Sequence, residues 1–97
     1  MNVDTEGREE VRIICIVHAS PEAQVTWYKN QKLLSTNDNV ISKRGNRHTL
    51  LLTALSEEDR QSEFECKAKN ELGEDSSIIT INSDTHSETI RMVVMLL

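Results

Sequence analysis

Hydrophobic and polar residues alternate along several short stretches of the chain, and polar turns separate these stretches. In "VRIICIV", Val11, Ile13, Cys15 and Val17 fall on one side, because successive side chains of a strand point to opposite faces. Similar alternation recurs in residues 25–30, 40–55, 63–69 and 77–82. No long segment has the period of a helix. The pattern therefore predicts an all-β protein with about seven short strands in an antiparallel sandwich.

The pattern changes after Asn82. Residues 83–89, "SDTHSET", are polar and resemble a linker, and the chain then ends in "IRMVVMLL". The six apolar residues 92–97 are too few to span a membrane, which takes about 20. We therefore expect one folded domain in residues 1–82, followed by a polar linker with a short apolar tail in residues 83–97. The tail is expected to be disordered unless it docks on an apolar face.

Size and charge narrow the function further. The chain has 97 residues, which is the size of a single domain. Its formal net charge of −5 argues against nucleic-acid binding, because phosphate neutralisation needs a basic face. With no apolar stretch of about 20 residues, no direct membrane insertion of this segment is expected. The opening "MNVDTEGREE" has no apolar signal core, which favours one domain of a longer protein.

The two cysteines, Cys15 and Cys66, admit three interpretations. An even count is compatible with a disulfide but does not establish one. A catalytic thiol would need activation by His18, His48 or His86, and a cysteine on a buried strand face is inert. A zinc site would need four ligands, and the sequence has no C-x-x-C or H-x-x-x-H pair. We therefore expect no enzyme activity, no catalytic residue, no cofactor and no metal.

Several motifs together resemble one family. Trp27 follows Cys15 by twelve residues, and Cys66 comes 51 residues after Cys15, which is the spacing of an immunoglobulin core. The chain also contains "WYKN" from Trp27, a run of leucines leading to Glu58 and Asp59, and "F-x-C-x-A-x-N-x-x-G" from Phe64. Over residues 6–82 the chain resembles an I-set immunoglobulin domain, and it is similar to invertebrate neural adhesion proteins of the amalgam, lachesin and klingon group.

The resemblance implies a two-sheet antiparallel immunoglobulin sandwich with Greek-key connections. It also implies a Cys15–Cys66 disulfide and a core that contains Trp27, Leu50, Leu52 and Phe64. Two departures from the family pattern bear on one loop. Phe64 stands where the family has a tyrosine whose hydroxyl bonds back to that loop. The segment "DRQSEFEC" is one residue longer than the family's and has no glycine, which leaves the partner of Asp59 open.

Two surfaces are candidates for partner binding. The first is the outer face of the sheet with Trp27, where Tyr28, Lys67 and Lys69 would lie, and exposed tyrosines are favoured anchors of interfaces. A tyrosine is also simply a good strand residue. The second is a stripe of Ile14, Ile16 and Leu51, which a neighbouring domain, a second copy or the apolar tail could cover. Branched aliphatic residues are equally ordinary on exposed strands.

These observations predict a non-catalytic protein–protein recognition module of an extracellular cell-adhesion or cell-surface protein. Its partner would be a cell-surface protein bound homophilically or heterophilically, and a weak homodimer is compatible with this. The alternative is an intracellular structural module of a sarcomeric or cytoskeletal protein, where thiols stay reduced. The sequence has no N-x-S/T sequon, so both candidate surfaces are open to a partner.

Overall fold

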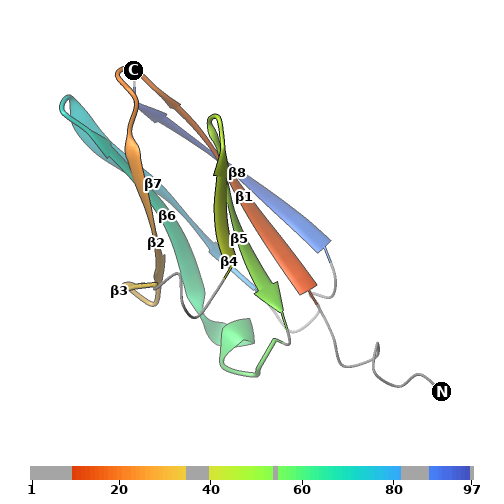
Figure 1. Cartoon of the computed structure of the whole chain (residues 1–97). Coiled ribbons are helices and arrows are strands. Elements are labelled where there is room, and N and C mark those ends of the chain that lie inside the picture. The colour runs from red at the N-terminus through yellow and green to blue at the C-terminus, as the bar shows by residue number, and fades with distance from the viewer. Residues whose placement is uncertain (1–9, 35–39, 54, 82–87, 97) are drawn as a thin grey trace.

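A computed structural model describes residues 10–34, 40–53, 55–81 and 88–96. Within them the chain forms eight strands and one short 3-10 turn, η2 (Figure 1). The elements in chain order are β1 (Glu10–Ala19), β2 (Gln24–Lys29), β3 (Lys32–Leu33), β4 (Val40–Arg44), β5 (Arg47–Thr53), η2 (Asp59–Gln61), β6 (Glu63–Asn70), β7 (Gly73–Thr80) and β8 (Glu88–Leu96).

The strands form two four-stranded sheets. The Cys15 sheet has the order β4-β5-β1-β8, and the Trp27 sheet has the order β3-β2-β6-β7. All strand pairs are antiparallel except β1 with β8, which are parallel. The predicted all-β immunoglobulin sandwich is thus confirmed, with one parallel pair that the prediction did not include.

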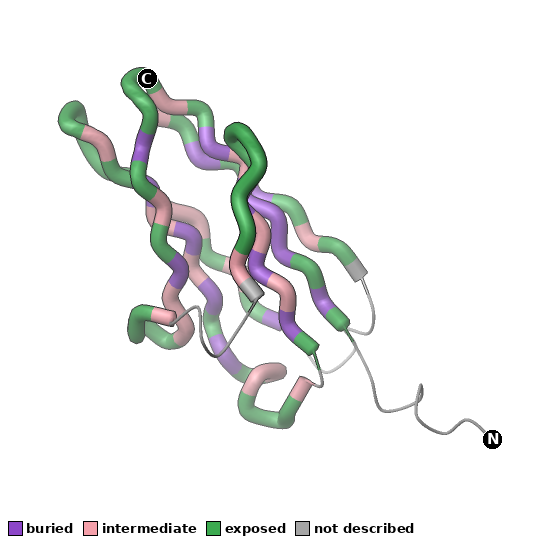
Figure 2. Tube along the Cα trace, in the orientation of Figure 1, coloured by how far each residue is buried: buried purple, intermediate pink, exposed green. Residues whose placement is uncertain are grey.

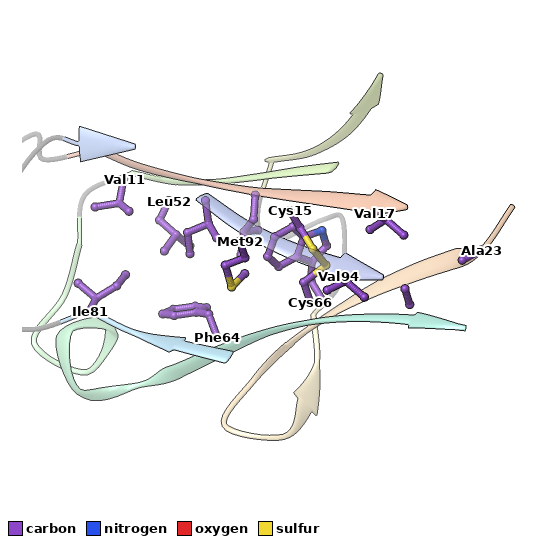
Figure 3. Close-up of a cluster of buried hydrophobic side chains, with 14 residues drawn as sticks. Val11, Cys15, Val17, Ala23, Leu52, Phe64, Cys66, Ile81, Met92 and Val94 are labelled. Carbon is purple, nitrogen blue, oxygen red and sulfur yellow. A yellow bond between two sulfur atoms is a disulfide. The ribbon is translucent and has the colours of Figure 1, made fainter. Parts of the chain in front are cut away.

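The core lies between the two sheets and contains the disulfide. Burial alternates along β1 and β6 (Figure 2), as the period of a strand requires. Cys15 and Cys66 are bonded, with 6.5 Å between their Cα atoms. Figure 3 shows this bond among the buried side chains of both sheets. The most buried members include Trp27, Leu50, Leu52 and Phe64, together with Val11, Ile13, Ala68, Ile81, Met92 and Val94.

Trp27 is opposite Cys66 in the register of β2 and β6, so its ring packs beside the disulfide. Its indole N–H is buried and has no hydrogen-bond partner among the described residues. An unpaired donor costs about 1–3 kcal/mol. Burying an aromatic side chain of 150–250 Å² contributes about 4–6 kcal/mol at 25 cal/mol per Å². Ring burial therefore outweighs the cost of the unpaired N–H.

The turn between β2 and β3 is hydrogen-bonded to the end of the loop that joins β5 to β6. Asn30 and Gln31 form a two-residue turn and both have positive φ, 50° and 70°, as a type I′ hairpin turn requires. The Asn30 side chain donates to Ser62 Oγ at 3.1 Å and accepts from the Glu63 N–H at 2.9 Å. Ser62 Oγ donates to the Glu58 carbonyl at 2.6 Å. These bonds anchor the loop between β5 and β6. Phe64 cannot hydrogen-bond to this loop, because it lacks the hydroxyl of the family's tyrosine.

Asp59, whose partner the sequence left open, pairs with Lys29. Lys29 Nζ lies 2.8 Å from Asp59 Oδ1. The other carboxylate oxygen accepts from the Ser56 N–H at 2.9 Å, and Ser56 Oγ accepts from the Asp59 N–H at 3.1 Å. Burial acts to raise the pKa of Asp59, but the bonds from Lys29 and Ser56 outweigh it, and the net shift is downward. Ser56 and Asp59 thus bond reciprocally, as in a capping box, at the start of the turn that leads into η2.

The expectation of a disordered tail is corrected for residues 88–96, which form β8. The segment alternates: Met92 and Val94 are buried, while Val93 and Met95 are exposed. Its pairing with β1 runs from Glu88 beside Val11 to Leu96 beside Ala19. In an immunoglobulin sheet with the strand order A-B-E-D, strand A is the edge strand that pairs with strand B, which carries the first cysteine. Here β8 occupies that place.

The packing of β8 predicts a contrast between two adjacent valines. Val94→Ala should cost about 2 kcal/mol of unfolding free energy, because it removes buried methyl groups and leaves a cavity. Val93→Ala should change stability by less than about 0.5 kcal/mol, because the Val93 side chain is solvent-exposed. Urea unfolding of both variants and the parent would measure this. Equal costs for the two substitutions would show that β8 does not pack as described.

Candidate functional site

A row of side chains crosses all four strands on the outer face of the Trp27 sheet. Leu33 is opposite Tyr28, Tyr28 is opposite Glu65, and Glu65 is opposite Ile78. Directly opposed residues lie on the same face with Cβ atoms about 4.5–5.5 Å apart. Leu33 and Ile78 are 65% and 53% exposed, and Tyr28 is half-buried. We call these four residues the Tyr28 row.

Lys67 is held over the ring of Tyr28. Its ammonium lies 5.1 Å from the ring centroid, within the range of a cation–π contact. The same ammonium is 3.3 Å from Glu74 Oε2. The hydrogen bond and the charge of Glu74 raise the pKa of Lys67 above its ordinary value. The row therefore has a positive charge in a defined position beside its only aromatic ring.

Lys69, the third candidate of this face, lies outside the row. It is exposed and is opposite Gln24 on β2 and Glu74 on β7. The structure thus brings Tyr28 and Lys67 into contact and leaves Lys69 further along β6.

Sequence reasoning did not identify Leu33 and Ile78 as surface residues of this face. A signal existed for Ile78 in the alternation of residues 77–82, because Ile78 lies on the opposite face of the strand from Ile79 and Ile81, which pack in the core. No signal existed for Leu33, since β3 has only two residues and its placement follows from the Asn30–Gln31 turn. Leu72, at the turn between β6 and β7, is a further exposed apolar residue of this sheet.

The second candidate surface, the stripe on the Cys15 sheet, needs correction. Ile14 is only 6% exposed, and Ile16 and Leu51 are half-buried. Ile14 is on a central strand, flanked by Thr49 of β5 and Arg91 of β8. Strand β8 adds this second neighbour, which no local pattern in the sequence indicates, and removes most of the exposed surface of Ile14.

Strand β8 supplies more exposed apolar surface to this face than the three predicted residues do. Val93 is opposite Ile16, and Val93 and Met95 are 58% and 53% exposed. Four arginines lie on the same outer face by register, and all are exposed: Arg12, Arg44, Arg47 and Arg91. This face is therefore basic, although the chain as a whole has a charge of −5.

An open groove of about 570 Å³ lies where the start of β2 approaches β4 and β5. Lys43 and Glu22 on its rim form an exposed ion pair of 2.7 Å, which lowers the pKa of Glu22. His48 lines the groove and is almost completely buried. Within the described ranges, no three potential metal ligands gather. No helix among those residues is long and apolar enough to cross a membrane.

Comparison with known proteins identifies the family. The immunoglobulin I-set domain family matches residues 1–82, so this chain belongs to that family. Such a domain is a recognition fold and is usually non-catalytic. The comparison does not resolve the narrower resemblance to invertebrate neural adhesion proteins.

Three curated relatives illustrate the breadth of the family. Alpha-protein kinase 3 of Homo sapiens is 40% identical over 68 residues, covering 66% of this chain and 4% of that protein. Hemicentin-2 of Mus musculus is 36% identical over 76 residues, covering 73% and 2%. Cell adhesion molecule DSCAML1 of Gallus gallus is 32% identical over 77 residues, covering 77% and 4%. The chain therefore spans a small fraction of each relative.

A solved structure has the same fold. It is the crystal structure of the titin M10–obscurin-like 1 immunoglobulin complex, with a TM-score of 0.54 and 20% identity, covering 92% of this chain and 97% of that chain. At this identity the similarity concerns the fold alone.

Burial of His48 predicts a pH-dependent stability. Desolvation, followed by the charge of Lys43, lowers the pKa of His48 below 6.5 in the folded chain, against a smaller opposite effect of Glu22. The unfolded chain then binds more protons as pH falls below about 6.5. The unfolding free energy should therefore decrease between pH 7 and pH 5, and His48→Gln should weaken that decrease.

His18→Gln is the matched control, because the His18 side chain is exposed on the same sheet. It should leave the pH dependence of the parent unchanged. Urea unfolding at several pH values measures both variants. A decrease that persists in His48→Gln and disappears in His18→Gln would contradict the assignment.

Proposed function

We propose that this chain is a non-catalytic protein-recognition module of an extracellular cell-adhesion or cell-surface recognition protein. It binds its protein partner through the outer face of the Trp27 sheet, with the Tyr28 row at the centre and Lys67 beside it. The resemblance to invertebrate neural adhesion proteins supports a neural setting. The partner is a surface protein, either a different one or another copy of the parent protein.

The observation that carries this proposal is the exposure of Leu33 and Ile78 in register with Tyr28. Exposed apolar side chains in one row give a partner a continuous contact, and tyrosine is enriched among the residues that dominate binding energy. Glu65 and Lys67 supply the polar groups that fix orientation at such contacts. Because Glu74 already positions Lys67, less side-chain entropy is lost on binding.

The Cys15–Cys66 disulfide supports the extracellular part of the proposal. Structural disulfides persist in oxidising compartments and are rare in the cytosol. Among the relatives, DSCAML1 is a cell adhesion molecule by name, which supports the same compartment.

The second candidate function is an intracellular structural module of a sarcomeric or cytoskeletal protein. The similarity to alpha-protein kinase 3, at 40% identity, and the shared fold with the titin M10–obscurin-like 1 complex favour this candidate. The two candidates differ in the compartment and therefore in whether the cysteines are oxidised.

Binding through the Tyr28 row predicts a large effect of one substitution. Tyr28→Ala should weaken partner binding about 30-fold, which corresponds to a loss of about 2 kcal/mol at an anchor residue. The oxidised domain, displayed as a tetramer, would be applied to an array of cell-surface ectodomains that includes the domain itself. Dissociation constants would then be measured for each protein that binds.

His18→Gln, on the outer face of the other sheet, is the control and should bind as the parent does. Binding that Tyr28→Ala leaves unchanged would place the interface elsewhere. A properly folded, oxidised tetramer that binds no ectodomain of the array would count against the recognition function itself.

The compartment can be tested by the dependence of folding on the disulfide. The bond links cysteines separated by 51 residues, and a loop of that size contributes about 4 kcal/mol. Reduction should then lower the thermal midpoint by about 15 °C or more, since 1 kcal/mol shifts the midpoint of a domain this size by 4–8 °C. Calorimetry with and without reductant measures it. A reduced form that melts within a few degrees of the oxidised form would favour the intracellular candidate.

A further inference from the structure

The four edge strands of the sandwich differ in how they are protected against pairing with another chain. Strand β3 has two residues. Strands β4 and β7 each place a charged residue on the core-facing set: Lys43 opposite His48, and Asp75 opposite Ala68. Short edges and inward-pointing charges are devices that prevent edge-to-edge association. Three of the four edges thus carry such a device.

Residues 89–96 of strand β8 carry none of these devices; the only charged position of its core-facing set is Glu88, at the start of the strand opposite Val11. The strand has nine residues without proline, and after Glu88 its core-facing set is entirely apolar: Ile90, Met92, Val94 and Leu96. Arg91 is the only charged residue between positions 89 and 96. Figure 1 shows β8 alongside β1, on the side away from β5. An exposed, long and largely apolar edge of this kind favours pairing with a further strand.

The backbone groups that would pair are identified by one hydrogen bond. The Leu96 carbonyl accepts from the Ser20 N–H at 3.3 Å, so Leu96 directs its polar groups toward β1. Alternate residues of a strand direct these groups to opposite sides. The N–H and C=O groups of Thr89, Arg91, Val93 and Met95 therefore point away from β1, and no strand among the described residues pairs with them.

We propose that β8 pairs antiparallel with β8 of a second copy of this chain, forming a two-fold symmetric dimer with one continuous eight-stranded sheet. This surface is separate from the Tyr28 row, so the proposal does not rest on the proposed recognition function.

The alternation of β8 restricts the register of this pair. Residues that oppose each other across the two strands lie on the same face of the sheet. An even-numbered residue must therefore oppose an even-numbered one, and an odd-numbered residue an odd-numbered one, because any other register would place the buried Met92 or Val94 on the outer face. The register centred on Met92 pairs all four outward-pointing residues, with Thr89 opposite Met95 and Arg91 opposite Val93 of the second copy. No two arginines are then opposed, and like charges directly opposite would be destabilising. The strand is therefore complementary to itself.

The size of the contact indicates a weak dimer. A nine-residue strand is about 30 Å long at 3.3 Å per residue, and two layers are about 10 Å thick. The strip on each copy is thus roughly 300 Å², well below the about 800 Å² per partner of a standard stable interface. Several domains on one cell surface would need to pair together for this contact to hold.

Sedimentation and hydrogen exchange of the oxidised chain, as a function of its concentration, test the proposal. A dimer should accumulate as the concentration approaches about 1 mM. In the same range the amides of Thr89, Arg91, Val93 and Met95 should exchange more slowly. The amides of Met92 and Val94, which point toward β1, should be protected at every concentration. A monomer throughout, or a dimer that leaves the four outward amides unprotected, would overturn the proposal.

Val93→Pro is the decisive variant, because it removes an outward N–H that β1 does not use, and proline is tolerated at such edge positions. Its dimer should be lost. Val93→Lys, which places a charge at the edge, should also abolish the dimer if the proline variant fails to fold. Leu72→Lys is the matched control: Leu72 is a similarly exposed apolar residue at the β6–β7 turn of the other sheet, outside the Tyr28 row, and its substitution should leave the dimer intact.

Two results would contradict the assignment to β8. A dimer that survives both Val93 substitutions would have to use another surface, or exchange β8 between copies without using its outer edge. A dimer lost in Leu72→Lys and retained in Val93→Pro would lie on the Trp27 sheet. In either case Tyr28→Ala tests the recognition function separately.

Discussion

The covalent bond between Cys15 and Cys66 joins the two strands on which both sheets depend. Strand β1 is flanked by β5 and β8, and β6 is flanked by β2 and β7. Each cysteine is therefore at a central position of its sheet, so a single bond fixes the separation and alignment of both layers. Trp27 and His48 are the neighbours of the two half-cystines in register. Their burial follows from this alignment.

The two outer faces of the sandwich have different chemistry. The face of the Trp27 sheet combines exposed aliphatic residues with a ring and a positioned ammonium, and its charges are of both signs. The face of the Cys15 sheet has four arginines beside the half-buried Ile16 and the exposed Val93 and Met95. Such different surfaces on one small domain allow two contacts at once, because binding on one face leaves the other accessible.

The core could be predicted from the sequence because it depends on short-range alternation. The alternation of a few neighbouring residues is enough to indicate which side chains face the core, among them those of Val11, Ile13, Leu50 and Phe64. The outer surface could not be predicted in the same way. The exposure of Leu33 requires the β2–β3 turn, and the burial of Ile14 requires its pairing with Arg91, a residue 77 positions away in the chain. The sequence pattern of the six apolar residues 92–97 does not distinguish a disordered tail from a strand.

The parallel direction of β8 has a mechanical consequence. Glu10 begins β1 at one end of the sandwich, and Leu96 ends β8 at the opposite end, beside Ala19 (Figure 1). A force that pulls Glu10 and Leu96 apart would slide the two strands along each other, so all hydrogen bonds between them would share the load. Antiparallel neighbours pulled at adjacent ends would instead separate one bond at a time. The rate of forced unfolding, which depends on the unfolding barrier, would therefore be low along this axis.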